Sequence, residues 1–288
     1  MDKKEQDGQK RSEDGRSKPV NLVPIMGAGL ESMLPNAINR PGLSASEHFL
    51  LLRVNPQYAN FDDLTLASCA GDRQRVEALL RSGADMNGRS GSGTTALIES
   101  LSHGHYEIAQ LLLDHGAAVD EISTAGWTAL HLAATSGLAM LVSEILTRAA
   151  NINSQTQDGW TPLMLAARRR YPNIVKLLLE NGADTNLSDY TGMTALIYAA
   201  TGDIDESGGD FGCIEALIIG GAHANAQDSQ GWTALMGASF YGDVESVRLL
   251  LANSAEVDAR DHQGRTALGL AKEQGHEKVV RALEAASA

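Results

Sequence analysis

A five-residue motif recurs along the chain at a nearly constant interval, and this periodicity constrains the fold more than any other feature. Gly-Trp-Thr-Ala-Leu at 126–130 returns as Gly-Trp-Thr-Pro-Leu at 159–163 and again as Gly-Trp-Thr-Ala-Leu at 231–235. The leucines that close these motifs and their variants are Leu97, Leu130, Leu163, Leu196, Leu235 and Leu268. They are spaced by 33, 33, 33, 39 and 33 residues. Such a period is typical of stacked repeats, in which each unit packs on its neighbours instead of forming one closed core.

A further, degenerate unit precedes these six. Leu64 lies 33 residues before Leu97 and closes the segment Asn60-Phe61-Asp62-Asp63-Leu64. Asn tolerates the left-handed backbone that Gly supplies in the other units, and Asp can cap a helix as Thr does. We therefore expect seven repeats.

The pattern within each unit predicts a pair of helices. The motif threonine is a good N-cap for the first helix, as at Thr128 and Thr161. A glycine at a common offset, as at Gly137, separates the two helices. The fourth unit has Arg170 at this offset, followed by Pro172, which suits the first turn of a helix. We expect its helix-to-helix loop to differ in shape from those of its neighbours.

These repeats resemble the ankyrin family, whose signature is Thr-Pro-Leu-His-x-Ala. The closest copy is Thr128-Ala129-Leu130-His131-Leu132-Ala133. The resemblance implies an all-α fold, a solenoid of stacked helix-turn-helix units with β-turn fingers. It also implies a non-catalytic protein-protein interaction module that acts as an adaptor, scaffold or stoichiometric inhibitor. A partner protein would dock on the concave surface formed by the fingers and first helices, and His131 would be a structural hydrogen-bonding residue.

The chain divides into three regions by composition. Residues 1–43 are polar at first and then lack periodicity, so we expect a disordered or weakly ordered segment. Residues 44–59 contain a capping box, Ser44-Ala45-Ser46-Glu47, ahead of an apolar run, which predicts a short helix followed by a linker. This helix would cover the first repeat, or alternatively bind a partner. Residues 60–288 form the repeat domain, with a six-residue insertion near 202–212.

Candidate partner-binding residues stand at repeat positions that ligands commonly contact in the ankyrin family. Large aromatic side chains and arginines are frequent at interface hot spots. The aromatic residues could instead pack one finger against the next, and the arginines could complement the dipole of the helix that they end. The predicted contact residues are Trp127, Trp160, Arg168, Arg169, Trp232, Phe240 and Tyr241.

The insertion in the fifth repeat is acidic. Asp203, Asp205, Glu206 and Asp210 could supply oxygen ligands to Ca²⁺, but their spacing is not that of an EF-hand. A solvated acidic loop is the alternative interpretation. The insertion at 203–210 supports the alternative function, a regulatory subunit or Ca²⁺-dependent switch.

The charge of the chain limits the classes of partner that it can bind. The first sixty residues hold eight basic and seven acidic side chains, and the remainder holds 15 basic and 29 acidic ones. Because the region after residue 60 is so acidic, nucleic acid and anionic membranes are unfavourable partners.

Two cysteines cannot form a disulfide framework. Cys213 aligns with the apolar Ile174, which predicts burial, whereas Cys69 aligns with variable positions, which predicts exposure.

No catalytic motif is present: the sequence lacks a phosphate-binding loop, a nucleophile elbow and a zinc-protease signature. We expect no catalytic residues, no metal ligands and no cofactor. The chain is expected to be a monomer in the cytoplasm. Lys10-Arg11 with Arg16 and Lys18 is a weak nuclear-localisation pattern, which adds the nucleus as a second location; a solvated charged tail is the alternative interpretation.

Overall fold

The computed structural model describes residues 43–55, 58, 61–91, 93–202 and 211–287. All of these residues lie in one compact unit, Arg40–Ala288. The predicted N-terminal segment 1–43, apart from Leu43, lies outside the described residues, as does most of the insertion.

Helices make up the regular structure, and they alternate between two classes after a leading helix α1, Ala45–Val54. The described residues contain no β-strand, only an isolated bridge between Ser188 and Thr194. The fold is therefore all-α. The first helices of the pairs are α2 (Asp63–Ala70), α4 (Ala96–Ser102), α6 (Ala129–Thr135), α8 (Pro162–Arg168), α10 (Ala195–Thr201), α12 (Ala234–Tyr241) and α14 (Ala267–Gln274). The second helices are α3 (Arg73–Arg81), α5 (Tyr106–Asp114), α7 (Ala139–Thr147), α9 (Pro172–Glu180), α11 (Gly212–Ile219), α13 (Val244–Ala252) and α15 (Glu277–Ala286).

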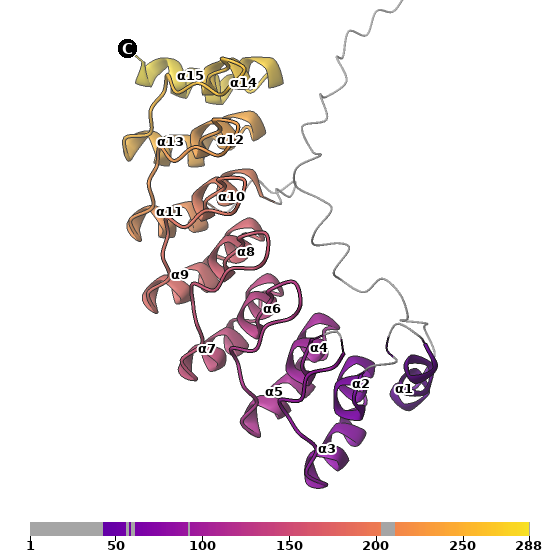
Figure 1. Cartoon of the computed structure of the whole chain (residues 1–288). Coiled ribbons are helices and arrows are strands. Elements are labelled where there is room, and N and C mark those ends of the chain that lie inside the picture. Colours follow the sequence, from indigo (N-terminus) through magenta and orange to yellow (C-terminus); the bar gives the residue numbers. More distant parts are fainter. Residues whose placement is uncertain (1–42, 56–57, 59–60, 92, 203–210, 288) are drawn as a thin grey trace, which may run out of the picture. The chain divides into compact units, whose positions relative to one another are not determined.

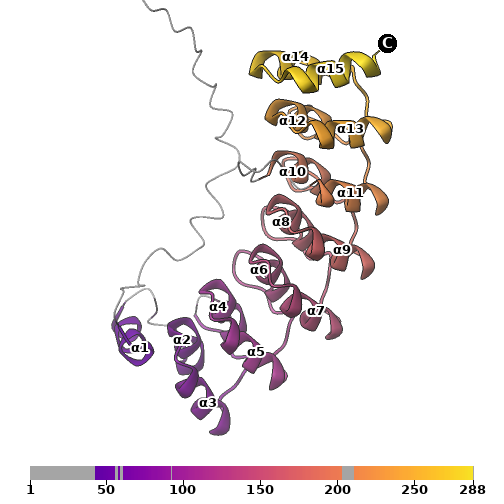
Figure 2. The same ribbon diagram turned by 180° about the vertical axis from the view of Figure 1, so that it is seen from behind.

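The helix pairs stack in sequence order (Figure 1). Each first helix packs on the first helices of its neighbours, from α2 to α14, and on its own second helix. Seen from either side, the first helices form one row and the second helices another (Figure 2). The interior between pairs is apolar: the motif leucines Leu130, Leu163 and Leu196 are at most 1% exposed. Because a single pair cannot bury this surface alone, stability depends on neighbouring pairs.

The predicted threonine caps are confirmed. The side chain of Thr128 accepts a hydrogen bond from the backbone N–H of His131, and Thr161 does the same with Met164. The degenerate first unit follows the rule with a carboxylate, since Asp62 accepts from the N–H of Thr65. The hydroxyls and carboxylate thus satisfy N–H groups that a helix end would otherwise leave unpaired. The other caps of this kind are Thr95, Thr194, Thr233 and Thr266.

The prediction of a differently shaped loop at Arg170 is wrong. Arg170 adopts a left-handed φ of 55°, whereas Gly137 at the same place in the preceding repeat has a φ of 77°. The backbone N–H of Tyr171 then bonds to the carbonyl of Ala166 at 3.0 Å, as the neighbouring loops do. Pro172 begins α9, as predicted. The arginine therefore accepts an unfavourable backbone conformation so that the common loop is kept.

The fingers between successive helix pairs are joined to one another through their backbones. The N–H of Gln157 donates to the carbonyl of Ala125, and the N–H of Tyr190 donates to that of Asp158. At Gly159, which has a φ of 85°, an added Cβ would lie 2.9 Å from the nitrogen of Tyr190. The motif glycine is thus required both for its backbone conformation and for the close approach of the next finger.

Helix α1 packs on α2 through Phe49 and Leu52, which are 3% and 1% exposed. Ser44 and Glu47 form the predicted capping box at its start. The guanidinium of Arg75 from α3 lies 4.0 Å from the centre of the Phe49 ring. In the part of the chain that the structure describes, no helix combines the length and apolar character that crossing a membrane requires.

Candidate functional site

The three tryptophans lie at the junction between a finger and the first helix that follows it. Each stands directly before the N-cap threonine and is half-buried. Their backbone N–H groups donate back into the finger: Trp160 to the hydroxyl of Thr156 at 3.2 Å, and Trp232 to the carboxylate of Asp228 at 2.8 Å. The turn therefore holds each indole at an equivalent place in its repeat.

Trp160 belongs to a group that spans two repeats, which we call the Trp160 cluster: Trp160, Arg168 and Tyr198. The guanidinium carbon of Arg168 lies 5.3 Å from the indole centre. The ring of Tyr198, from α10 of the next repeat, lies 4.7 Å from it at an angle of 39°. Tyr198 is 4% exposed and donates its hydroxyl proton to Asp189 at 2.5 Å. Burial and the Asp189 carboxylate raise the pKa of Tyr198, so it remains a donor.

A second group, the Trp232 cluster, consists of Trp232, Phe240, Tyr241 and Arg265. The Trp232 and Phe240 rings meet edge to face at 5.9 Å, and Phe240 meets Tyr241 in the same way at 5.1 Å. Arg265 of the next repeat places its guanidinium carbon 5.6 Å from the Trp232 ring. Tyr241 is 39% exposed. This cluster therefore offers an aromatic edge to solvent, whereas the Arg265 guanidinium is paired with the Asp261 carboxylate at 2.7 Å.

Trp127 stands apart from both clusters and contacts His131, at 5.8 Å between ring centres. His131 is fully buried, and one of its ring nitrogens lies 2.9 Å from the carbonyl of Trp160. Its other nitrogen completes a capping box with Thr128. Burial is the largest cause that lowers the pKa of His131, to about 4, so the imidazole is neutral at physiological pH. His131 thus links the third repeat to the fourth, which confirms its structural role.

The predicted contact residues therefore do not form one continuous patch of ring contacts. Among the described residues, ring and cation contacts join Trp160 to Arg168, and Trp232 to Phe240, but none joins the two clusters. Arg169 is the C-cap of α8. The third arginine of that run, Arg170, turns inward: its side chain is 9% exposed and lies 3.8 Å from the Asp243 carboxylate.

Sequence reasoning missed Tyr190, which is 77% exposed. It occupies the finger tip of the fifth repeat. The fingers on either side of it, in the fourth and sixth repeats, lead to Trp160 and Trp232. A direct comparison of the third to seventh repeats could have found it, because this position holds hydrophilic residues in the other four of them. Those residues are Thr124, Gln157, Ser229 and His262.

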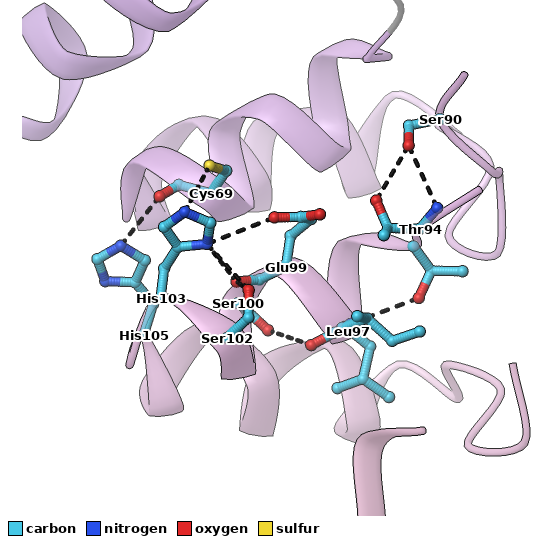
Figure 3. A network of polar contacts seen from close by, with 11 residues as sticks. Cys69, Ser90, Thr94, Leu97, Glu99, Ser100, Ser102, His103 and His105 are labelled. Carbon is cyan, nitrogen blue, oxygen red and sulfur yellow. Dashed lines mark hydrogen bonds and ion pairs between the residues drawn. The ribbon is translucent and has the colours of Figure 1, made fainter. Parts of the chain in front are cut away.

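A group of titratable side chains lies outside these clusters, between α2 and α4 (Figure 3). The Cys69 sulfur is 3.3 Å from Nε2 of His103, and Nδ1 of His103 is 3.4 Å from the Glu99 carboxylate. The predicted exposure of Cys69 is wrong, since it is 0% exposed, whereas Cys213 is buried as expected. Cys69 is short and lies beside His103, so the ring shields it. Burial raises the pKa of the Cys69 thiol, and a buried neutral thiol does not act as a nucleophile.

The possible Ca²⁺ ligands Asp203, Asp205, Glu206 and Asp210 lie outside the described residues. The flanking helices α10 and α11 nevertheless pack on their neighbours in the same way as in the other repeats.

Comparison with known proteins agrees with the architecture. A family model described as ankyrin repeats (3 copies) matches residues 64–156, 137–207 and 205–287. Comparison with curated proteins gives no match. Because the matched segments together run from residue 64 to 287 and carry the repeated helix pairs, the chain belongs to the ankyrin-repeat family.

Proposed function

We propose that this chain is a non-catalytic adaptor, scaffold or stoichiometric inhibitor that binds a partner protein on its finger and first-helix side. Ankyrin repeats are in general protein-protein interaction modules. The observation that carries the proposed surface is the row of aromatic side chains on three successive repeats. Trp160 belongs to the fourth repeat, Tyr190 to the fifth, and Trp232 and Tyr241 to the sixth.

Exposure and packing both favour this row as a contact surface. Tyr190 is 77% exposed and Tyr241 is 39% exposed, so a partner can cover a large aromatic area. The tryptophans are held by the fingers, and Arg168 is placed over Trp160. Aromatic side chains that are held before binding lose little conformational freedom on docking, and they commonly become hot spots.

Charge defines the partner further. The region from residue 61 onward carries about twice as many acidic as basic side chains, so a neutral or basic protein surface is favoured. Arg168 and Arg169 add a local positive charge beside the Trp160 cluster, which suits a carboxylate on the partner. We therefore propose a partner with a basic or neutral face that carries an acidic residue opposite α8. The cytoplasm, with the nucleus as an alternative, remains our proposed location, and a monomer our proposed state.

The test compares three forms of the full chain in affinity capture, followed by titration of the captured protein. The first is the natural sequence and the second carries Tyr190→Ala with Tyr241→Ala. The third is a control with Met140→Ala and Ile219→Ala, residues of the second helices that are 88% and 81% exposed. We expect the tyrosine variant to bind about 30-fold or more weakly, as for loss of a typical hot spot of about 2 kcal/mol.

The control should retain the affinity of the natural chain, because its changes lie in the other row of helices. Retention of affinity in the tyrosine variant, with loss in the control, would place the interface on the second helices and refute the proposed surface. Melting curves of all three proteins show whether each remains folded.

A further inference from the structure

We propose that Cys69, Glu99 and His103 form a zinc-binding site between the first helices of the first two repeats. The site is separate from the proposed partner-binding surface. It comprises a sulfur from α2 and two ligands from α4 or its C-cap, and no spacing motif of the sequence reveals it because the ligands are 30 and 4 residues apart.

The three ligand atoms already lie close together. One ligand atom from each residue can be chosen so that all lie within 4.8 Å of one another. The Cys69 sulfur and Nε2 of His103 are 3.3 Å apart (Figure 3). Around a tetrahedral zinc ion, ligand atoms are separated by about 3.3–3.6 Å, given bonds of about 2.0–2.3 Å. The Glu99 carboxylate lies 3.4 Å from Nδ1 of His103, and its movement toward Nε2 and the sulfur would complete three of the four positions.

The histidine is oriented as a zinc ligand requires. Nδ1 of His103 lies 3.0 Å from the backbone carbonyl of Glu99 and 3.0 Å from the hydroxyl of Ser102. A proton on Nδ1 can be donated to that carbonyl, which leaves the lone pair on Nε2 directed toward Cys69. Metal-binding histidines commonly have their other ring nitrogen fixed in this way by a carbonyl or carboxylate.

Charge balance favours a divalent cation. Cys69 is a neutral thiol in the absence of metal, and binding of Zn²⁺ would release its proton. The resulting thiolate and the Glu99 carboxylate would together carry two negative charges. Within the described residues, the ion pair recorded for Glu99 is with His103, which is neutral in the proposed tautomer. One Zn²⁺ ion would neutralise the thiolate and carboxylate together.

A further imidazole comes from α1, which packs on the helix α2 that carries Cys69. Nε2 of this residue, His48, is buried and has no hydrogen-bond partner. The His103 side chain is 15% exposed and that of Glu99 9%, so His103 is the ligand nearest to solvent. Sulfur and imidazole ligands select zinc over calcium and magnesium.

The test uses the full chain without an affinity tag, stripped with a chelator and titrated with Zn²⁺ in a calorimeter and with Co²⁺ in a spectrophotometer. We expect one ion per chain, a higher melting temperature with Zn²⁺, and a thiolate-to-cobalt charge-transfer band. Ca²⁺ should leave the melting temperature unchanged. Cys69→Ala and Glu99→Gln should weaken zinc binding by more than about 100-fold, since even changes to groups behind the ligands cost about 10–100-fold.

Cys213→Ala is the matched control, because it removes the other buried thiol in a different repeat. It should bind Zn²⁺ and Co²⁺ as the natural chain does. Glu99→Gln keeps the shape of the side chain, so its melting curve without metal separates loss of a ligand from loss of folding. The proposal is overturned if the natural chain shows no charge-transfer band, or if Cys69→Ala and Glu99→Gln bind zinc as tightly as the Cys213→Ala control.

Discussion

The buried imidazole of His131 makes stability depend on pH in a way that one substitution can isolate. The native pKa of His131 is about 4, against 6.5 for an ordinary histidine. Above pH 6.5 the His131 side chain is neutral in both the native and the unfolded chain, so its native contacts contribute fully to the free energy of unfolding. As the pH falls below 6.5 toward 4, the unfolded chain binds a proton that the native chain cannot, so stability falls.

The size of the effect follows from the two pKa values. At pH 5.5 about nine in ten unfolded chains carry the proton on this residue, whereas few native chains do. The native protein therefore loses about 1.3 kcal/mol between pH 7.5 and 5.5 through His131 alone. His131→Gln removes this contribution while it keeps a capping-box residue at the third position of α6. At pH 7.5 the free energy of unfolding of the variant should be about 1 kcal/mol lower than that of the natural chain, because the hydrogen bond to the Trp160 carbonyl is lost.

Urea unfolding at pH 7.5 and 5.5, followed by circular dichroism at low protein concentration, measures both quantities. The natural chain should lose about 1.3 kcal/mol more than His131→Gln over this interval, since all other titrating groups are shared. Parallel losses in the two proteins would refute the reasoning and would mean that the native His131 can be protonated.

Three further predictions test other parts of the fold by the same unfolding assay. Tyr198→Phe leaves one oxygen of the buried Asp189 carboxylate without its donor and should lower the free energy of unfolding by about 1.5–3 kcal/mol. Tyr190→Phe, at an exposed finger tip, is the control and should change stability little. Equal effects of the two substitutions would contradict the role of the Tyr198 hydroxyl. Leu163→Ala removes a side chain that is 1% exposed inside the stack and should cost about 2–5 kcal/mol, and a loss below about 1 kcal/mol would argue against a shared interior. Gly137→Ala places a Cβ 3.0 Å from an aromatic ring at a φ of 77° and should cost about 1–2 kcal/mol; an unchanged midpoint would show that the loop can relax.

Much of the fold could be predicted because it is encoded locally and repeatedly. Thr128 and Thr161 cap helices through side chains that reach only three residues along the chain, so a sequence motif is sufficient to find them. Even the degenerate copy with Asp62 obeys the rule. Arg170 was harder, because the neighbouring repeats impose the loop on a residue whose own preference is different.

The candidate sites were predictable only in part, because their side chains come from different repeats. The position of Trp160 follows from the motif, but its contact with Tyr198 depends on how two repeats stack. Cys69 aligned with residues of mixed character, and its burial depends on His103 and on packing around α2 that no pattern in the sequence specifies. Tyr190 could have been recognised by comparing the third to seventh repeats, because the other four residues at its position there are hydrophilic.

The fifth repeat is six residues longer than its neighbours, yet α10 still packs between α8 and α12. The extra residues fall in the sequence between α10 and α11, and both helices still pack on their neighbours. Lengthening a connection between helices costs little free energy compared with disturbing packed helices. This connection is therefore a natural place to graft a fluorescent peptide or an epitope, which would allow the protein to be followed without altering its termini or its row of fingers.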